Sequence, residues 1–494
     1  MSKGIVYLTG AGPGFEDLIT LRGLDKLKIS DVIVYDRLVN KNLLSFAKDG
    51  ARLIYVGKEN KNHTMTQDEI NHLLAREALE GKVVTRLKGG DPYVFGRGSE
   101  EALYLRERGI VFEVIPGISS FSGGLTFAGI PLSHRKVSRS FHVFTGHKAD
   151  DSDLDYKKLA GLDGTIVFLM GLSRIGEITK GLMDAGMDPK TPAAAVENAA
   201  NFNTRKIISS LEKLEGEILK KKFKSPSLLI VGETVKLSDE LDFLMAKPLF
   251  SKNVVLFRDR IRGEKTLKAF NEMGANAFLL PSFKINYLPD DFILSKIGDL
   301  KSYDLVIFSS QNAVNGFFTA FFKKFDLRDF SNTKFLAIGP KTEKALNEFY
   351  VKVDYVSQKA VGESLVQKLK EISGPRKLKV LYPRSNITRE EILLDLDKIC
   401  DLNSFPVYEN EKEVNSEIFE SLLKLESPYL VFTSSSSFNN FYESYERAED
   451  LLKKGKIISI GEITTSAIKK RFFNPYRESE KSTIEDIINI IRKD

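Results

Sequence analysis

The segment 84–98, which reads VTRLKGGDPYVFGRG, constrains the fold of this chain more than any other feature. It begins as a buried strand of β-branched and apolar residues, which two glycines, an aspartate and a proline then end. A charged helix is predicted to start at residue 99. Because glycines carry no Cβ, a ligand can approach the backbone of this loop closely. The alternative is a tight turn, since glycine is the usual turn residue.

Length and charge bound the class of protein. A length of 494 residues predicts about three domains of ~150 residues each. The net charge of +6 permits a basic cleft for an acidic substrate, but it is too small to indicate nucleic-acid binding. No apolar run approaches the roughly 18 residues of a membrane span. We therefore expect neither a nucleic acid nor a membrane as a partner.

Cysteine and histidine usage argues against a metal centre. The single cysteine, Cys400, excludes a disulfide framework and a thiolate metal cluster, and it fits a reducing cytosol. The five histidines are not spaced as metal ligands. The segment 1–8 runs directly into a predicted strand and lacks the apolar region of a signal peptide. We therefore expect a cytoplasmic protein with no metal site.

The best domain boundary lies near 236–252. The segment 226–232 (PSLLIVG) is typical of a last buried strand, 247–252 (KPLFSK) of a linker, and 253–257 (NVVLF) of a new strand. Both halves alternate short apolar runs with helical patterns, which predicts α/β layers joined by strand–helix connections.

The second half contains an internal repeat, which predicts two lobes. The segment 308–318 (FSSQNAVNGFF) resembles 432–442 (FTSSSSFNNFY), and 338–342 (IGPKT) is echoed by 460–464 (IGEIT). Each copy places a hydroxyl-rich loop between a strand and a helix. Such loops either bind anions at the helix N-terminus or cap the helix with a Ser or Thr side chain. Two facing lobes would form a cleft with donors from both walls.

The segment 7–14 (YLTGAGPG) does not favour a dinucleotide site. The dinucleotide fingerprint needs a third glycine where Phe15 stands. Proline also lacks the backbone N–H that would bind a pyrophosphate.

Taken in order, the motifs of the first half resemble the tetrapyrrole methylase family, most closely its uroporphyrinogen-III C-methyltransferases. The resemblance covers about residues 4–245 and implies two α/β lobes, about 1–115 and 116–245, that hold S-adenosylmethionine between them. It also implies a homodimer formed through this half. The motifs are 10–14 (GAGPG), 35–39 (YDRLV), 56–58 (VGK), 87–92 (LKGGDP), 115–120 (IPGISS), 129–135 (GIPLSHR), 170–171 (MG) and 226–233 (PSLLIVGE).

The resemblance also implies the residues that contact S-adenosylmethionine. A sulfonium cofactor needs backbone acceptors and apolar walls rather than a phosphate cradle. Met170 suits such a wall as a soft, adaptable contact, although it could instead be a core residue. The implied cofactor contacts are Pro13, Gly89, Gly90, Asp91, Val94, Ser119, Ser120, Met170 and Ala199.

Methyl transfer to a pyrrole carbon requires alignment of donor and acceptor and removal of a proton. Asp36 and Lys58 match the positions that the family assigns as proton acceptor and proton donor. The alternative is a plain ion pair, which is common and weak at a surface. Arg37, His134 and Arg135 are candidates to hold carboxylates of the substrate, since arginine suits bidentate pairing.

The second half, 250–494, resembles the uroporphyrinogen-III synthase family. The resemblance implies that lobe one contains 253–284 and 411–494 and that lobe two contains 289–405. Asp259 departs from the proline that usually follows the arginine at 258. The motifs are 255–258 (VLFR), 308–313 (FSSQNA), 337–342 (AIGPKT), 381–384 (LYPR), 405–408 (FPVY), 432–434 (FTS) and 460–464 (IGEIT).

This family closes hydroxymethylbilane into a ring with inversion of the last pyrrole and loss of water. The intermediate is reactive, so a cleft of hydroxyls and amides suffices to fold the substrate and direct one carbon. Tyr408 matches a tyrosine that could assist loss of hydroxide, or it packs at a lobe junction. The candidate substrate-binding residues are Arg258, Ser310, Thr342, Arg384, Thr433, Ser434 and Thr464.

The predicted fold class is α/β, with a two-lobed tetrapyrrole methylase fold followed by a two-lobed uroporphyrinogen-III synthase-like fold. The leading hypothesis is a bifunctional enzyme that makes uroporphyrinogen III and methylates it twice, at C2 and C7, to precorrin-2. One alternative is a methylase for a different tetrapyrrole. Another is a second half that is a non-catalytic, tetrapyrrole-binding regulatory domain, because two-lobed clefts also serve binding proteins.

Overall fold

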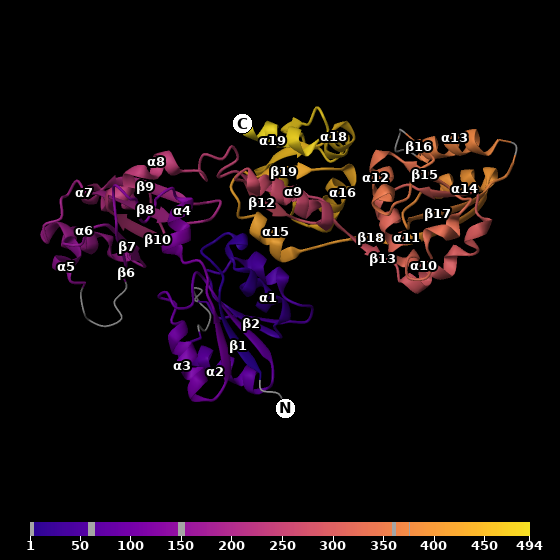
Figure 1. Cartoon of the computed structure of the whole chain (residues 1–494). Helices are drawn as coiled ribbons and strands as arrows, with labels where there is room; N and C mark the ends of the chain where they lie inside the picture. Colours follow the sequence, from indigo (N-terminus) through magenta and orange to yellow (C-terminus); the bar gives the residue numbers. More distant parts are fainter. Residues whose placement is uncertain (1–3, 58–64, 147–153, 358–361, 375) are drawn as a thin grey trace. The chain divides into compact units, whose positions relative to one another are not determined.

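The computed structural model describes residues 4–57, 65–146, 154–357, 362–374 and 376–494. The chain divides into two compact units, and each contains two sheets (Figure 1). The first unit comprises Met1–Lys252 and Asn271–Asn276, and the second comprises Asn253–Phe270 and Ala277–Asp494. Both are α/β, so the predicted fold class is confirmed.

The first sheet is parallel, with strand order β3-β2-β4-β1-β5. Because the carboxyl ends of parallel strands meet at one edge, the loops that follow these strands gather there. Three helices connect the strands. The elements are β1 (Ile5–Gly10), α1 (Leu21–Ile29), β2 (Val32–Tyr35), β3 (Arg52–Tyr55), α2 (Gln67–Leu79), β4 (Val83–Lys88), α3 (Gly98–Glu107) and β5 (Val111–Ile115).

Helix α2 forms where sequence signals and packing agree. Thr66 caps its N-terminus in a capping box with Glu69. Its apolar residues Ile70 and Leu74 then pack against β-branched strand residues such as Val34. Helix α2 thereby covers one face of the sheet over β2 and β4.

The second sheet of the first unit is mixed, with order β6-β7-β10-β8-β9. Helices α6 and α7 pack against one face, and apolar residues around α4 pack against the other. The elements are α4 (Leu125–Phe127), β6 (Phe141–Thr145), α5 (Tyr156–Ala160), β7 (Thr165–Leu169), α6 (Ile175–Asp184), β8 (Pro192–Glu197), β9 (Arg205–Ser210), α7 (Leu211–Lys220), β10 (Ser227–Val231) and α8 (Ser238–Leu241).

In the second unit the chain begins in one sheet, builds the other, and returns to the first. The first of these sheets has order β12-β11-β19-β20-β21. Its elements are β11 (Asn253–Phe257), α9 (Arg260–Glu272), β12 (Asn276–Leu279), α15 (Ser416–Leu422), β19 (Tyr429–Phe432), α16 (Ser435–Ser444), α17 (Ala448–Lys454), β20 (Lys456–Ser459), α18 (Glu462–Lys469), β21 (Arg477–Glu478) and α19 (Ile484–Arg492).

The other sheet of this unit has order β13-β18-β17-β14-β15-β16. It includes β13 and the far end of β18, so it extends beyond the 289–405 predicted for lobe two. Its elements are β13 (Phe283–Tyr287), α10 (Asp290–Ile297), β14 (Leu305–Phe308), α11 (Gln311–Phe321), β15 (Lys334–Ile338), α12 (Pro340–Glu348), β16 (Tyr355–Ser357), α13 (Gly362–Ser373), β17 (Lys379–Ser385), α14 (Glu390–Ile399) and β18 (Asp401–Lys412).

Aromatic packing dominates the core of this larger sheet. Helix α11 buries Phe317, Phe318 and Phe321 on one side, where they meet Phe308 of β14 and Phe330. Such ring contacts stabilise beyond the area that they bury. On the opposite face lies Cys400, whose burial raises the pKa of its thiol to about 11. Among the described residues, none of the helices combines the length and apolar character that a membrane span needs.

Candidate active sites

In the first unit, three glycine loops meet at the carboxyl edge of the parallel sheet. The Gly90 N–H donates to the Gly12 carbonyl at 2.8 Å, and the Gly12 N–H donates to the Gly90 carbonyl at 3.3 Å. A Cβ added to Gly10 would come within 2.6 Å of the Gly90 carbonyl oxygen, and one on Gly117 would collide with it. The loops after β1, β4 and β5 can therefore pack backbone to backbone only because these positions lack side chains.

Asp91 ties this arrangement together. Its Oδ1 accepts from the Tyr93 N–H at 2.8 Å and its Oδ2 accepts from the Gly117 N–H at 3.0 Å. The neighbouring Gly90 has a φ of +72°, and a Cβ built there would meet only the Ser119 Cα, at 4.0 Å. The carboxylate thus binds loop to loop, while the space beside Gly90 stays open.

Five non-glycine residues with positive φ lie in loops that follow strands of this unit, in one loop of the first sheet and two of the second. Non-glycine residues rarely adopt positive φ, and such residues cluster at functional sites. They follow β4, β7 and β8 here, at Phe95, Arg97, Met170, Asn198 and Ala200. Met170 is 51% exposed, which rules out the alternative that it is a core residue.

The remaining predicted cofactor contacts come from both sheets of the unit. The Phe15 N–H, just after the Pro13 loop, donates to the Ala200 carbonyl at 2.9 Å. A Cβ on Gly124 would approach the Ala199 Cβ at 2.8 Å, so a small residue is required there. Gly89, Val94 and Ser120 are half-buried and Ser119 is buried. Open backbone, a half-exposed methionine and small residues fit a sulfonium nucleoside better than a phosphate.

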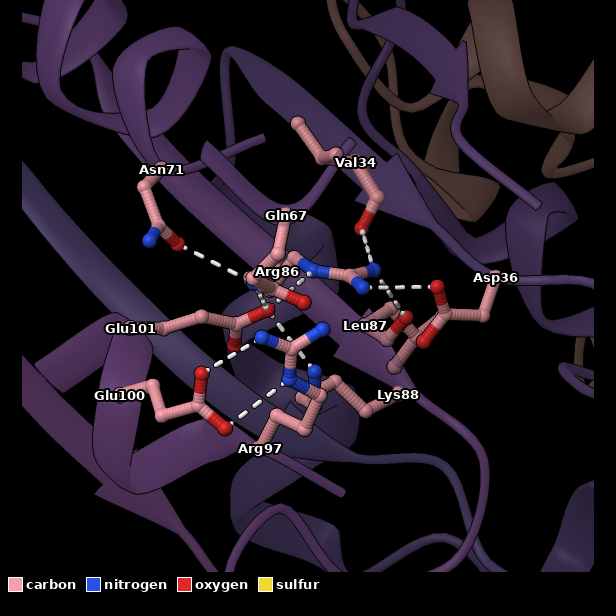
Figure 2. Close-up of polar contacts among 10 residues, drawn as sticks. All are labelled: Val34, Asp36, Gln67, Asn71, Arg86, Leu87, Lys88, Arg97, Glu100 and Glu101. Atoms are coloured by element: carbon pink, nitrogen blue, oxygen red, sulfur yellow. Dashed lines mark hydrogen bonds and ion pairs between the residues drawn. The ribbon is translucent and has the colours of Figure 1, made fainter. Parts of the chain in front are cut away.

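Asp36 lies directly after β2, and its partner is a buried arginine. The Arg86 Nη2 donates to the Asp36 Oδ1 at 2.7 Å, and the Arg86 Nε donates to the Glu101 Oε1 at 3.1 Å (Figure 2). The Lys88 Nζ donates to the same Glu101 oxygen at 2.8 Å. The Asp36 side chain is 30% exposed, whereas Arg86 is only 2% exposed. Asp36 thus makes an ion pair with a buried arginine, whereas the pairing with Lys58 considered as an alternative involves a residue outside those that the structure describes.

The other predicted residues of this half differ in placement. Lys58 lies outside the described residues. Arg37, His134 and Arg135 are exposed on loops. The His134 Nδ1 accepts from the Lys136 N–H at 3.4 Å within its own turn. Nothing in their packing prevents these side chains from reaching a substrate carboxylate.

In the second unit, two successive serines after β14 each meet a tyrosine. The Tyr408 hydroxyl of β18 lies 3.1 Å from the Ser310 Oγ, and the Tyr382 hydroxyl of β17 donates to the Ser309 Oγ at 3.0 Å. Tyr382 was not among the residues predicted for this site. Four consecutive residues of β17, Val380 to Pro383, are buried, so alternation along the strand gave no signal for this contact.

Many of the predicted carboxylate binders already make internal hydrogen bonds. Ser310 and Ser434 cap α11 and α16, as the capping alternative describes. The Thr342 hydroxyl is buried and donates to the Ile338 carbonyl at 2.8 Å, and Thr464 is also buried. The remaining three are half-buried: the Thr433 hydroxyl donates to the Phe257 carbonyl, Arg258 donates to Thr266, and Arg384 donates to the Ser385 carbonyl.

Comparison with known proteins places these sites in two families. The model for tetrapyrrole (corrin/porphyrin) methylases matches residues 5–215, and the model for uroporphyrinogen-III synthase HemD matches residues 264–489. The porphyrin biosynthesis protein HemD of Ruminiclostridium josui is 36% identical over 500 residues, which cover 99% of this chain and 98% of that protein. The chain therefore belongs to the same family as this porphyrin biosynthesis protein.

Further relatives match one half at a time. The siroheme synthase of Chromobacterium violaceum is 47% identical over 241 residues, or 49% of this chain and 51% of that protein. The chain thus spans about half the length of that relative. A Thermus thermophilus uroporphyrin-III C-methyl transferase complexed with S-adenyl homocysteine is 38% identical, with a TM-score of 0.41, and covers 47% of this chain and 94% of that one.

These families establish the general activities. The chain is a bifunctional enzyme of tetrapyrrole biosynthesis. Its first half is a methyltransferase that uses S-adenosylmethionine, and its second half is a uroporphyrinogen-III synthase.

We expect Gly90→Val to lower the affinity for S-adenosylmethionine at least about tenfold, because a β-branched side chain at positive φ is strained by roughly 1–2 kcal/mol and fills the open space. Gly109→Val is the matched control, since Gly109 also has a positive φ but no atom within 4 Å of an added Cβ. Titration calorimetry with the cofactor measures both. Unchanged affinity in Gly90→Val would contradict the loop assignment.

Proposed function

We propose that the second half closes hydroxymethylbilane to uroporphyrinogen III with inversion of ring D, and that the first half methylates this product at C2 and C7 to give precorrin-2. The observation that carries the proposal is that one chain matches both families and aligns with one relative over almost the whole length of both chains. The product of one half is then the substrate of the other. Precorrin-2 is an intermediate for sirohaem and cobalamin, and we infer a cytoplasmic location.

In the methyltransferase half, S-adenosylmethionine supplies an electrophilic methyl group. The residues that would hold it are Pro13, Gly89, Gly90, Asp91, Val94, Ser119, Ser120, Met170 and Ala199. Asp36 accepts the one proton that the pyrrole system loses as each new carbon–carbon bond forms, and Lys58 is the proposed proton donor of the site. Arg37, His134 and Arg135 pair with substrate carboxylates.

In the synthase half, the Tyr408 hydroxyl donates a hydrogen bond to the hydroxyl that leaves hydroxymethylbilane. That hydroxide, together with a proton, leaves as water. Ser310 shares a hydrogen bond with this phenol, which orients it. Arg258, Thr342, Arg384, Thr433, Ser434 and Thr464 bind carboxylates on the substrate rim. The alternative is a second half that only binds a tetrapyrrole and regulates the first.

Product analysis from hydroxymethylbilane separates these two functions. Without S-adenosylmethionine, we expect uroporphyrinogen III by mass spectrometry and isomer-resolving chromatography. With the cofactor, the mass should rise by two methyl groups. Only the spontaneous type I ring in both reactions would show that the second half is not a synthase. Methylation of added uroporphyrinogen III would still test the first half.

We expect Tyr408→Phe to slow ring closure by about 30- to 1000-fold, because one lost hydrogen bond to developing charge costs roughly 2–4 kcal/mol in the barrier. Tyr382→Phe is the matched control, since it also removes a phenol bonded to a serine, on the adjacent strand. Single-turnover rates of uroporphyrinogen III formation provide the measurement. Equal rates for the two variants would reduce Tyr408 to a packing residue.

We also propose that the chain forms a homodimer through isologous contacts of the methyltransferase half. Light scattering at micromolar concentration should give twice the 55.5 kDa of one chain. A mass of one chain at that concentration would remove this proposal.

A further inference from the structure

Asp36 belongs to a charged cluster with Arg86, Lys88 and Glu101, and these four side chains differ widely in exposure. Its two cations are buried, with side-chain exposures of 2% for Arg86 and 5% for Lys88, and Glu101 is fully buried. The only partly exposed member is Asp36, at 30%. Burying a charge is unfavourable unless it is paired, so this cluster is costly to build. Among the residues that the structure describes, Asp36 is thus the charged member of this cluster that reaches solvent, at the edge of the sheet.

A second cluster in the same sheet shows the more usual arrangement. Glu77 of α2 is 1% exposed, and its partners Arg52, Arg76 and Lys82 are 51%, 64% and 32% exposed. There the carboxylate is buried and the cations reach solvent, as long basic side chains readily do. The Asp36 cluster reverses this pattern, which a purely stabilising ion network does not require.

The geometry of Arg86 holds Asp36 in one place. Its guanidinium uses all three nitrogens: Nε donates to Glu101, Nη2 donates to Asp36, and Nη1 donates to the carbonyls of Val34 and Leu87 at 3.4 and 3.3 Å (Figure 2). Val34 precedes Asp36 by two residues on the neighbouring strand, in register with Arg86. A rigid fork with this many acceptors cannot turn without breaking several bonds, and a lysine could not replace it.

We propose that Arg86 is a positioning residue for methyl transfer: anchored on Glu101, it orients the Asp36 carboxylate to accept the substrate proton. This inference rests on the proposed role of Asp36. It adds a residue that does not touch the substrate and acts only through its partner.

The surrounding charges support this role of Arg86. Arg86 of β4 faces Asp36 and Glu101, and Lys88 of the same strand faces both carboxylates and Arg86. Burial alone would lower the pKa of Arg86, but the charges of Asp36 and Glu101 raise this pKa above its usual value. Burial, followed by the charge of Arg86, lowers the pKa of Lys88. Arg86 therefore stays charged beside Asp36, and Lys88 donates a hydrogen bond to Glu101.

The test is a double-mutant cycle in the full chain, with uroporphyrinogen III and S-adenosylmethionine as ligands. We expect Arg86→Lys to lower kcat for methylation about 10- to 100-fold with unchanged affinity for the cofactor. Because lysine keeps the positive charge but lacks the planar fork, this loss reports on how Asp36 is oriented rather than on the charge beside it. In an Asp36→Asn background, the same substitution should cause no further loss.

Glu77→Gln is the control for loss of a buried ion network. It should destabilise the first unit without lowering kcat of the folded enzyme. Losses that add in the cycle, or an unchanged kcat in Arg86→Lys, would overturn the inference and leave Asp36 as proposed. Full activity of Asp36→Asn would instead remove the proposed role of Asp36, and the positioning role with it.

Discussion

Direct contact between glycine backbones at the carboxyl edge of the first sheet is the constraint on which the methyltransferase half depends. Gly10, Gly90 and Gly117 come from three different loops, and a Cβ on Gly10 or Gly117 would strike the Gly90 carbonyl. Because the loops touch through main chain, their amides must be satisfied locally. Asp91 does this by accepting from the Gly117 N–H. The open side of Gly90 follows from that packing, and a cofactor site needs such an opening.

The same sheet separates stability from chemistry through its two charged clusters. Glu77 is buried and surrounded by cations. Burial alone would raise the pKa of its carboxyl, but hydrogen bonds from Lys82, Arg52 and Arg76 lower this pKa to about 2. A carboxyl with a depressed pKa stabilises the fold above its usual value of 4.5, and that contribution is lost as the pH falls toward 2. The Asp36 cluster instead directs a buried cation toward an accessible carboxylate. The first cluster therefore supports the fold, and the second is the one that we propose to serve proton transfer.

The sequence allows the strand–loop–helix unit at 84–98 to be predicted because its signals are local. A β-branched run, paired glycines and an acidic first turn determine β4 and α3 without knowledge of the rest of the chain. The partner of Asp36 could not be found in this way. Arg86 lies 50 residues away, and only the register of β2 against β4 brings the two together. The strand order that sets this register depends on the whole sheet.

The same limit explains the serines and tyrosines of the synthase half. A serine before a helix indicates a cap, and Ser310 does cap α11, but nothing local reveals that it also meets the Tyr408 hydroxyl. That meeting requires β17 and β18 to follow β14 across the sheet. Burial raises the pKa of Tyr382, so this phenol stays neutral. Ring closure through a reactive intermediate needs shape and neutral donors, whereas methylation needs a base, and the polar groups of each half follow from that difference.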